Sequence, residues 1–301
     1  MKTPKTAGGR DQRVPASTSR REFVAMSAAA AGLLAAAGST QAAESSILER
    51  DVVIHTSDGD CDAAFFYPAQ GMYPGVLIWP DIFGLRPAFR DFGRRLAAQG
   101  YSVLVPNLFY RSAKAPIYSD VSSISFQDPA TRAKMDQLTA PLGAPGAIEG
   151  DAHAFIAFLD AQRQVDKAKK IGTQGYCMSG PLAMKTAAVI SDRVGACATF
   201  HGGGLVTDKS DSPHLLAPKI RARMYIAIAA SDDARQPDAK DKLREAFAAA
   251  KVVAEVEVYP GTLHGWCVPD MPARDGAPTY NRPGAERAWA KLLALYKAVL
   301  A

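Results

Sequence analysis

A six-residue segment near the middle of this 301-residue chain constrains its fold more than any other feature. The segment is residues 175–180, with the sequence GYCMSG, and its small residues allow a tight turn between closely packed elements. Residues 169–174 before it have the pattern of a strand, and residues 182–188 after it have the pattern of a helix. The sequence therefore predicts a strand, a sharp turn centred on Cys177, and a helix.

Cys177 stands where a turn of this kind presents a nucleophile. It lies just before a predicted helix N-terminus, where free amides and the helix dipole favour a thiolate. Ser179 replaces the second glycine of the usual G-x-nucleophile-x-G pattern, which is an exchange of one small residue for another. The alternative is a structural cysteine, since free cysteines are among the most buried residues.

An acid and a histidine follow Cys177 in the chain, each after a predicted strand. Asp232 and Asp233 follow residues 224–230, and His264 lies in the turn that ends the next predicted strand. Ligand and catalytic groups gather at the carboxyl ends of strands in open α/β sheets. A thiol nucleophile needs a base and an acid that orients it, and this chain order suits them.

Two neighbouring aspartates compete for the role of the acid. Counting from the predicted strand end favours Asp232, whereas counting back from Pro237 favours Asp233. We choose Asp232, because loop lengths vary more readily than strand ends.

These motifs, together with residues 75–85 (GVLIWPDIFGL), resemble the dienelactone hydrolase family over roughly residues 48–300. The resemblance implies an α/β-hydrolase fold, with a mostly parallel central sheet and helices on both faces. It also implies a carboxylesterase of the carboxymethylenebutenolidase type, which hydrolyses ester or lactone bonds of a small molecule without a metal or other cofactor.

The resemblance assigns roles to individual residues. Cys177 matches the nucleophile, His264 the general base and Asp232 the orienting acid. The backbone amides of Ile82 and Met178 match the oxyanion hole, where each donor is typically worth about 3 kcal/mol.

The chain departs from the family pattern around the substrate. Asp81 replaces a glutamate that contacts the resting thiol in founding members. Arg132 matches one arginine that holds the substrate carboxylate, but a partner tyrosine is Asp136, and residues 265–268 lack the second arginine. These differences argue against a dienelactone substrate. We expect Asp81, Arg132 and Trp266 to line the substrate pocket, although Trp266 could instead pack in the core.

Short apolar runs alternate with helical segments after residue 75, which predicts a mostly parallel sheet covered by helices. Residues 110–146 are expected to lie over the site, with residues 269–283 as a loop near His264. Asp151 is expected on the water-facing side of a helix over residues 147–164. The predicted strands are a hairpin of 50–55 with 61–67, followed by 76–79, 103–106, 170–174, 194–200, 224–230 and 253–258.

Several other residues are placed less firmly by the sequence. His201 follows a predicted strand, and either lines the pocket or supports a turn. Tyr110 and Arg111 either contact substrate or lie on the surface. Cys61 and Cys197 lie on predicted strands and are expected in the core.

Two further function classes compete with the hydrolase. One is a non-catalytic small-molecule-binding protein on the same scaffold, because fold does not fix function. The other is a thiol or metal redox protein built from Cys177, His201, His264 and Cys267. Its support is weak, since the chain contains no C-x-x-C pair.

The N-terminus has the pattern of an export signal. Arg20 and Arg21 precede an alanine-rich run (25–37) and small residues before position 43, as in twin-arginine signals. We expect a signal peptide at 1–43, a hydrolase domain at 44–301, and a periplasmic or secreted monomer without stable membrane insertion. Residues 1–43 carry net charge +4 of the total +5, so the remainder has no basic surface that would favour nucleic acid.

Overall fold

The computed structural model describes residues 46–274 and 276–301. The segment expected to be a signal peptide lies outside these residues. The described residues belong to one compact unit, Ser45–Ala301. Within them, no helix has both the length and the apolar character needed to cross a bilayer.

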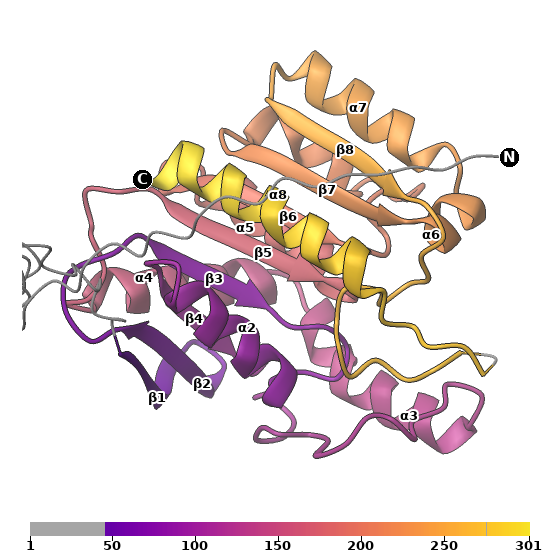
Figure 1. The fold of residues 1–301 in the computed structure, drawn as a ribbon, viewed down its shortest axis with the longest axis horizontal. Helices are drawn as coiled ribbons and strands as arrows, with labels where there is room; N and C mark the ends of the chain where they lie inside the picture. The colour runs from indigo at the N-terminus through magenta and orange to yellow at the C-terminus, as the bar shows by residue number, and fades with distance from the viewer. Residues whose placement is uncertain (1–45, 275) are drawn as a thin grey trace, which may run out of the picture. The chain divides into compact units, whose positions relative to one another are not determined.

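The centre of the unit is an eight-stranded sheet with the order β1-β2-β4-β3-β5-β6-β7-β8 (Figure 1). β1 and β2 form the predicted antiparallel hairpin, β2 also runs antiparallel to β4, and all remaining neighbours are parallel. The mostly parallel sheet is therefore confirmed. The strands are β1 (Ile47–Thr56), β2 (Gly59–Pro68), β3 (Gly75–Trp79), β4 (Ser102–Pro106), β5 (Ile171–Tyr176), β6 (Val194–Phe200), β7 (Arg223–Ala229) and β8 (Ala254–Tyr259).

Helices cover both faces of the sheet. One apolar core joins the sheet to α4, α5 and α7, and a second joins it to α2 and α8. Figure 1 shows α2 and α8 on the near side of the strands. The helices are α2 (Pro87–Ala97), α3 (Pro129–Thr139), α4 (Ala147–Ala161), α5 (Gly180–Val189), α6 (Ala230–Arg235), α7 (Ala239–Ala249) and α8 (Arg282–Leu300), with short 3₁₀ turns η1 (Ala140–Gly143), η2 (Cys177–Ser179) and η3 (Pro213–Lys219).

The central strands are buried throughout because both of their faces are covered. Every residue of β3, β4 and β5 is buried, as expected for parallel strands between two helix layers. Cys61 and Cys197 are fully buried in this core, as predicted. The order of the strands reverses between β3 and β5, and in open α/β sheets ligands bind beyond the strand ends at such a point.

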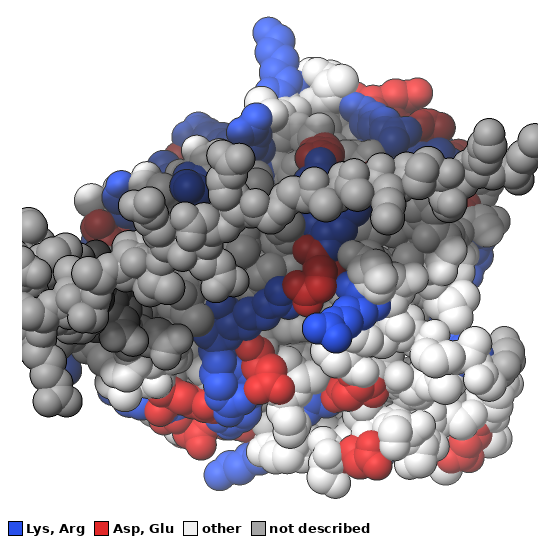
Figure 2. All heavy atoms as spheres, viewed as in Figure 1, with Lys and Arg blue, Asp and Glu red and all other residues white. Residues whose placement is uncertain are grey.

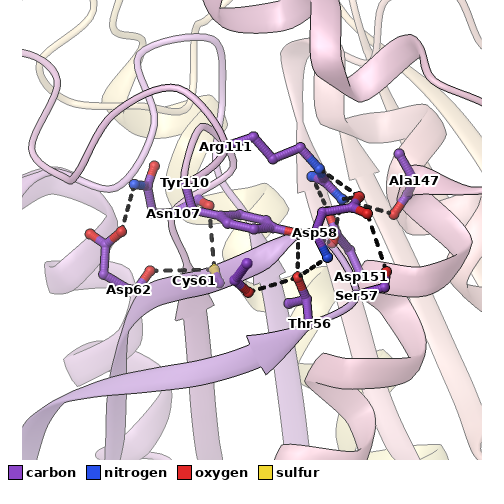
Figure 3. A network of polar contacts seen from close by, with 11 residues as sticks. Thr56, Ser57, Asp58, Cys61, Asp62, Asn107, Tyr110, Arg111, Ala147 and Asp151 are labelled. Atoms are coloured by element: carbon purple, nitrogen blue, oxygen red, sulfur yellow. Dashed lines mark hydrogen bonds and ion pairs between the residues drawn. The ribbon is translucent and has the colours of Figure 1, made fainter.

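A polar network joins the hairpin to α4 on the side of the sheet away from β8 (Figure 3). Arg111 binds Asp58 at 2.6 Å and Asp151 at 2.8 Å, and Tyr110 donates to Asp151 at 2.7 Å. The expectation that Asp151 faces water is wrong, because it is only 2% exposed. Helical periodicity could not reveal that the segment after β4 places a guanidinium and a hydroxyl group over this part of α4. Tyr110 and Arg111 thus belong to a structural network.

Figure 2 shows one face of the molecule. Among its described residues, charged side chains of both signs lie next to one another. Arg95 of α2 pairs with Glu286 of α8, and Lys291 of α8 pairs with Glu255 of β8. The mixture of signs does not form a basic surface of the kind that binds nucleic acid.

Candidate active site

The candidate nucleophile lies in the predicted sharp turn. Cys177 follows β5 directly and has φ of 56°, a left-handed conformation that costs free energy in a residue with a side chain. A Cβ atom on Gly175 would lie 2.0 Å from the carbonyl oxygen of Ser179, and one on Gly180 would lie 2.9 Å from Cα of Gly202. Only glycine fits at these two positions, so the sequence pattern produces the turn through close backbone packing.

Cys177, His264 and Asp232 form a continuous chain of contacts. The Sγ atom of Cys177 lies 3.1 Å from Nε2 of His264, and Nδ1 of His264 lies 2.8 Å from Oδ2 of Asp232. The three residues follow β5, β8 and β7, which all end at the same edge of the sheet. The tertiary structure therefore brings together three groups that are up to 87 residues apart in sequence.

The two neighbouring aspartates have different partners. Asp233 forms an ion pair with Lys240 at 2.8 Å, whereas Asp232 faces the imidazole. Ser231 also contributes, because its hydroxyl accepts a hydrogen bond from the backbone amide of His264 at 2.9 Å. Consecutive residues on the short helix α6 thus hold both the backbone and the ring of His264.

The surroundings of His264 favour its charged form. Burial by itself would lower its pKa, but hydrogen bonds to Asp232 and to the sulfur of Cys177, together with their charges, raise the pKa to about 9. The imidazole and the carboxylate are each 13% exposed, so water weakens their attraction only in part. The site can therefore hold an imidazolium next to the sulfur at neutral pH.

A second histidine packs against the first. The rings of His201 and His264 meet edge to face with centroids 4.9 Å apart. His201 is fully buried, and its Nδ1 lies 3.4 Å from Sγ of Cys267. Burial, aided by the charges of His264 and Arg274, lowers the pKa of His201 well below its ordinary value, so the ring is neutral. His201 and Cys267 thus both lie close to the site, and the sequence had left the place of His201 open.

The two backbone amides expected to form an oxyanion hole lie on segments that are tied together. The hydroxyl of Ser179 donates a hydrogen bond to the carbonyl of Pro80, which links the turn after β5 to the loop after β3. Ile82 and Met178 flank this link, and both are partly exposed. The sequence motif accounts for Ser179 only as a small residue and does not reveal this role of its hydroxyl.

Of the three residues expected to line the substrate pocket, two are buried and one is exposed on α3. Asp81 is fully buried and binds Arg86 at 2.6 Å. Trp266 is also fully buried and stacks on Tyr259 with centroids 4.3 Å apart, so it packs in the core rather than forming a pocket wall. Arg132 is exposed on α3, and its guanidinium donates to the carbonyls of residues 126 and 127.

A pocket of about 650 Å³ lies between residues 122–127 and residues 271–274. Phe126 of its wall packs against Phe83, next to Ile82, with ring centroids 5.8 Å apart. On the opposite side, a Cβ atom on the glycine after His264 would lie 2.6 Å from Met271. The pocket therefore borders both loops of the candidate site. It is formed by the two segments that the sequence placed over the site, although not by the three residues named for it.

Among the residues that the structure describes, which leave out position 275, Arg274 is the one charged residue that lines this pocket. No sequence signal pointed to Arg274, because it lies in a loop without a recognisable motif.

The four cysteines are free thiols. A series of contacts runs from Cys177 to His264, from His264 to His201, and from His201 to Cys267. Even so, the part of the chain that the structure describes contains no group of three or more His, Cys, Asp or Glu residues arranged to hold a metal ion.

The fold and the family comparison together define a hydrolase of the dienelactone hydrolase type. The chain belongs to the dienelactone hydrolase family, whose sequence profile matches residues 61–300. It is similar to a Synechocystis protein provisionally named a carboxymethylenebutenolidase, with 26% identity over 77% of this chain and 89% of the relative. A provisionally named carboxymethylenebutenolidase from Methylorubrum extorquens shares 27% identity over 91% of each chain.

Solved structures agree with this fold. A crystal structure from Klebsiella pneumoniae, provisionally titled a dienelactone hydrolase, has a TM-score of 0.69 and 23% identity, over 84% of this chain and 99% of its own. A metagenomic dienelactone hydrolase-like promiscuous phosphotriesterase has a TM-score of 0.68 and 22% identity, over 85% and 99%.

Proposed function

We propose that this protein hydrolyses carboxylic ester or lactone bonds with Cys177 as nucleophile, His264 as general base and Asp232 as the acid that orients the base. The observation that carries the proposal is the chain of contacts from Sγ through the imidazole to the carboxylate, at 3.1 and 2.8 Å. These distances are within the range in which a nucleophile and its base exchange a proton. The homologues named as carboxymethylenebutenolidases support the same reaction class.

The proposed reaction has two halves. In the resting enzyme His264 has taken the thiol proton at Nε2, and the thiolate of the resulting ion pair attacks the carbonyl carbon to form a tetrahedral intermediate. The amides of Ile82 and Met178 hold its oxyanion. Collapse breaks the bond to the alkoxide, which receives the proton from His264 and leaves a thioester on Cys177. Water, deprotonated by His264, then attacks the thioester and releases the acid and the free thiol.

We propose that the substrate enters the pocket between residues 122–127 and 271–274. Its volume of about 650 Å³ lies within the range of small-molecule sites. Serine hydroxyls, an amide and one guanidinium line it together with apolar side chains. This lining suits a substrate with both apolar and polar parts.

Turnover of a panel of aryl esters and lactones by the wild type and by Cys177→Ala tests the proposal. We expect the variant to lose at least about 1,000-fold in kcat/KM, because removing the nucleophile of such a triad has effects of this order or more. Equal turnover in the two proteins would exclude Cys177 from the mechanism. Labelling of Cys177 by iodoacetamide as a function of pH adds a test that needs no substrate, because a catalytic thiol reacts at lower pH than an inert one. Labelling only at alkaline pH, without turnover, would favour the binding protein.

We also propose that the enzyme is exported by the twin-arginine route to the periplasm or the medium. This proposal rests on the arginine pair at 20–21, which is followed by an apolar run and small residues. Cell fractionation of the full chain and of Arg20→Lys/Arg21→Lys tests this. The proposal requires export of the first protein and cytoplasmic retention of the second.

A further inference from the structure

A buried arginine outside the proposed triad joins the two loops that flank it. Arg86 is 2% exposed and donates hydrogen bonds to two carboxylates at once. Its Nη1 and Nη2 atoms bind Asp81 at 2.6 and 3.0 Å, and its Nε and Nη2 atoms bind Asp270 at 2.8 Å each. The rings of Phe83 and Phe89 lie within 5.4 Å of its guanidinium carbon.

One carboxylate belongs to the loop after β3. Asp81 immediately precedes Ile82, whose amide is a proposed oxyanion donor. The same carboxylate accepts a hydrogen bond from the amide of Phe83 at 2.9 Å, and the carbonyl of Asp81 accepts one from Gly84 at 2.9 Å. The backbone on both sides of the Ile82 amide is therefore fixed by Asp81, and Asp81 is fixed by Arg86.

The other carboxylate belongs to the loop after β8. Asp270 lies six residues after His264, and a ladder of backbone hydrogen bonds, from Val268 to Gly265 and from Met271 to Val268, connects the two. Met271 in turn lines the proposed substrate pocket. Arg86 thus holds the loop that carries the base and part of the pocket wall.

The ion pairs of Arg86 with Asp81 and Asp270 are expected to add little to the free energy of unfolding. Taking one guanidinium and a fully buried carboxylate out of water costs much of what their attraction returns, and apolar residues of similar volume often give equal stability. A bidentate arginine bridge differs from apolar packing in fixing both distance and orientation between the groups that it joins.

We propose that Arg86 is a positioning residue of the active site, which sets the Ile82 amide and the His264 loop relative to each other through Asp81 and Asp270. This inference rests on the proposed function. The bridge also keeps the Asp81 carboxylate bound to Arg86, so that His264 is the side chain that faces the resting Cys177 sulfur.

One variant removes the whole bridge, and a second weakens only its Asp270 end. Arg86→Met alone would leave Asp81 buried without a partner, so the double variant Asp81→Asn/Arg86→Met removes both charges and keeps an acceptor for Phe83. We expect its kcat to fall about 10- to 100-fold, since the oxyanion donor is displaced rather than deleted. We expect Asp270→Asn mainly to raise KM, several-fold, because it releases the pocket wall. Arg95→Met, on the exposed side of α2, is the matched control and should keep wild-type kinetics.

Hydrogen exchange provides a readout that does not depend on turnover. In the double variant, peptides covering 81–86 and 264–271 should both exchange faster, whereas labelling of Cys177 by iodoacetamide should change less than about threefold, because Asp232 and Ser231 still hold His264.

Unchanged exchange in 264–271, or a kcat within twofold of wild type in a folded double variant, would overturn the inference. If the wild type turned over no ester or lactone while exchange in both peptides rose together, the proposed function would fail and the bridge between the loops would stand.

Discussion

Replacing Asp232 by asparagine removes the negative charge that lies 2.8 Å from Nδ1 of His264 while keeping the size of the side chain. The carboxylate favours the imidazolium and also fixes the tautomer, since it can only accept a hydrogen bond from Nδ1. An asparagine amide can donate instead, which would place the remaining ring proton on Nε2, facing the sulfur. The base would then be unable to take the thiol proton.

The structure sets the size of the effect. A pKa of about 9 for His264, compared with an ordinary value of 6.5, corresponds to about 3 kcal/mol in favour of the imidazolium. Asp232 produces this effect together with Cys177, so neutralising Asp232 weakens the preference for the imidazolium and should cost about tenfold in rate. Loss of the correct tautomer adds at least another factor of about ten, and the corresponding change in a serine protease costs about 10⁴-fold. We therefore expect kcat/KM to fall by about 100-fold or more.

The assay is the pH dependence of kcat/KM for an aryl ester, with Asp233→Asn as the matched control. Asp233 differs by one position and binds Lys240 instead of the histidine, so its variant should stay within about threefold of wild type. In Asp232→Asn the alkaline limb of the profile should move to lower pH, because the pKa of His264 falls. Equal losses in the two variants, or a loss below fivefold in Asp232→Asn, would refute the assignment of the acid.

Three further results are expected. Gly175→Ala should give little folded protein, measured as soluble yield and circular dichroism, since its methyl group would lie 2.0 Å from a backbone oxygen; a well-folded variant would contradict the close packing of the turn. The raised pKa of His264 stabilises the fold fully below about pH 6.5, and this contribution is lost as pH rises through about 9; a melting temperature that does not fall over this range would contradict it. Asp151→Ala should lower the melting temperature by about 5–10 °C and leave kcat unchanged, because Arg111 and Tyr110 lose a buried partner. Asp58→Ala, which removes a more exposed partner of Arg111, should lower the melting temperature less. Equal decreases in the two variants would contradict the role of burial.

The sequence by itself determined the sheet, the turn and the order of the chemical groups. Alternating apolar and helical runs identified the strands because local patterns reflect which faces are covered. The glycines at 175 and 180 identified the turn because no larger residue fits there. The strand pattern placed Cys177 and His264 at strand ends. Because parallel strands end at one edge of the sheet, both residues were expected at that edge.

Only the tertiary structure decided which side chains meet. Counting along the sequence left both Asp232 and Asp233 possible and only favoured Asp232, and the two differ in the fold because one points to His264 and the other to Lys240. The bridge from Arg86 to Asp270 spans 184 positions, and no local pattern records such a pairing. Packing likewise placed Asp151 against Arg111 and Tyr110, and Trp266 in the core. Propensity and periodicity act over a few residues, whereas these contacts arise from packing between distant segments, and only the folded chain specifies them.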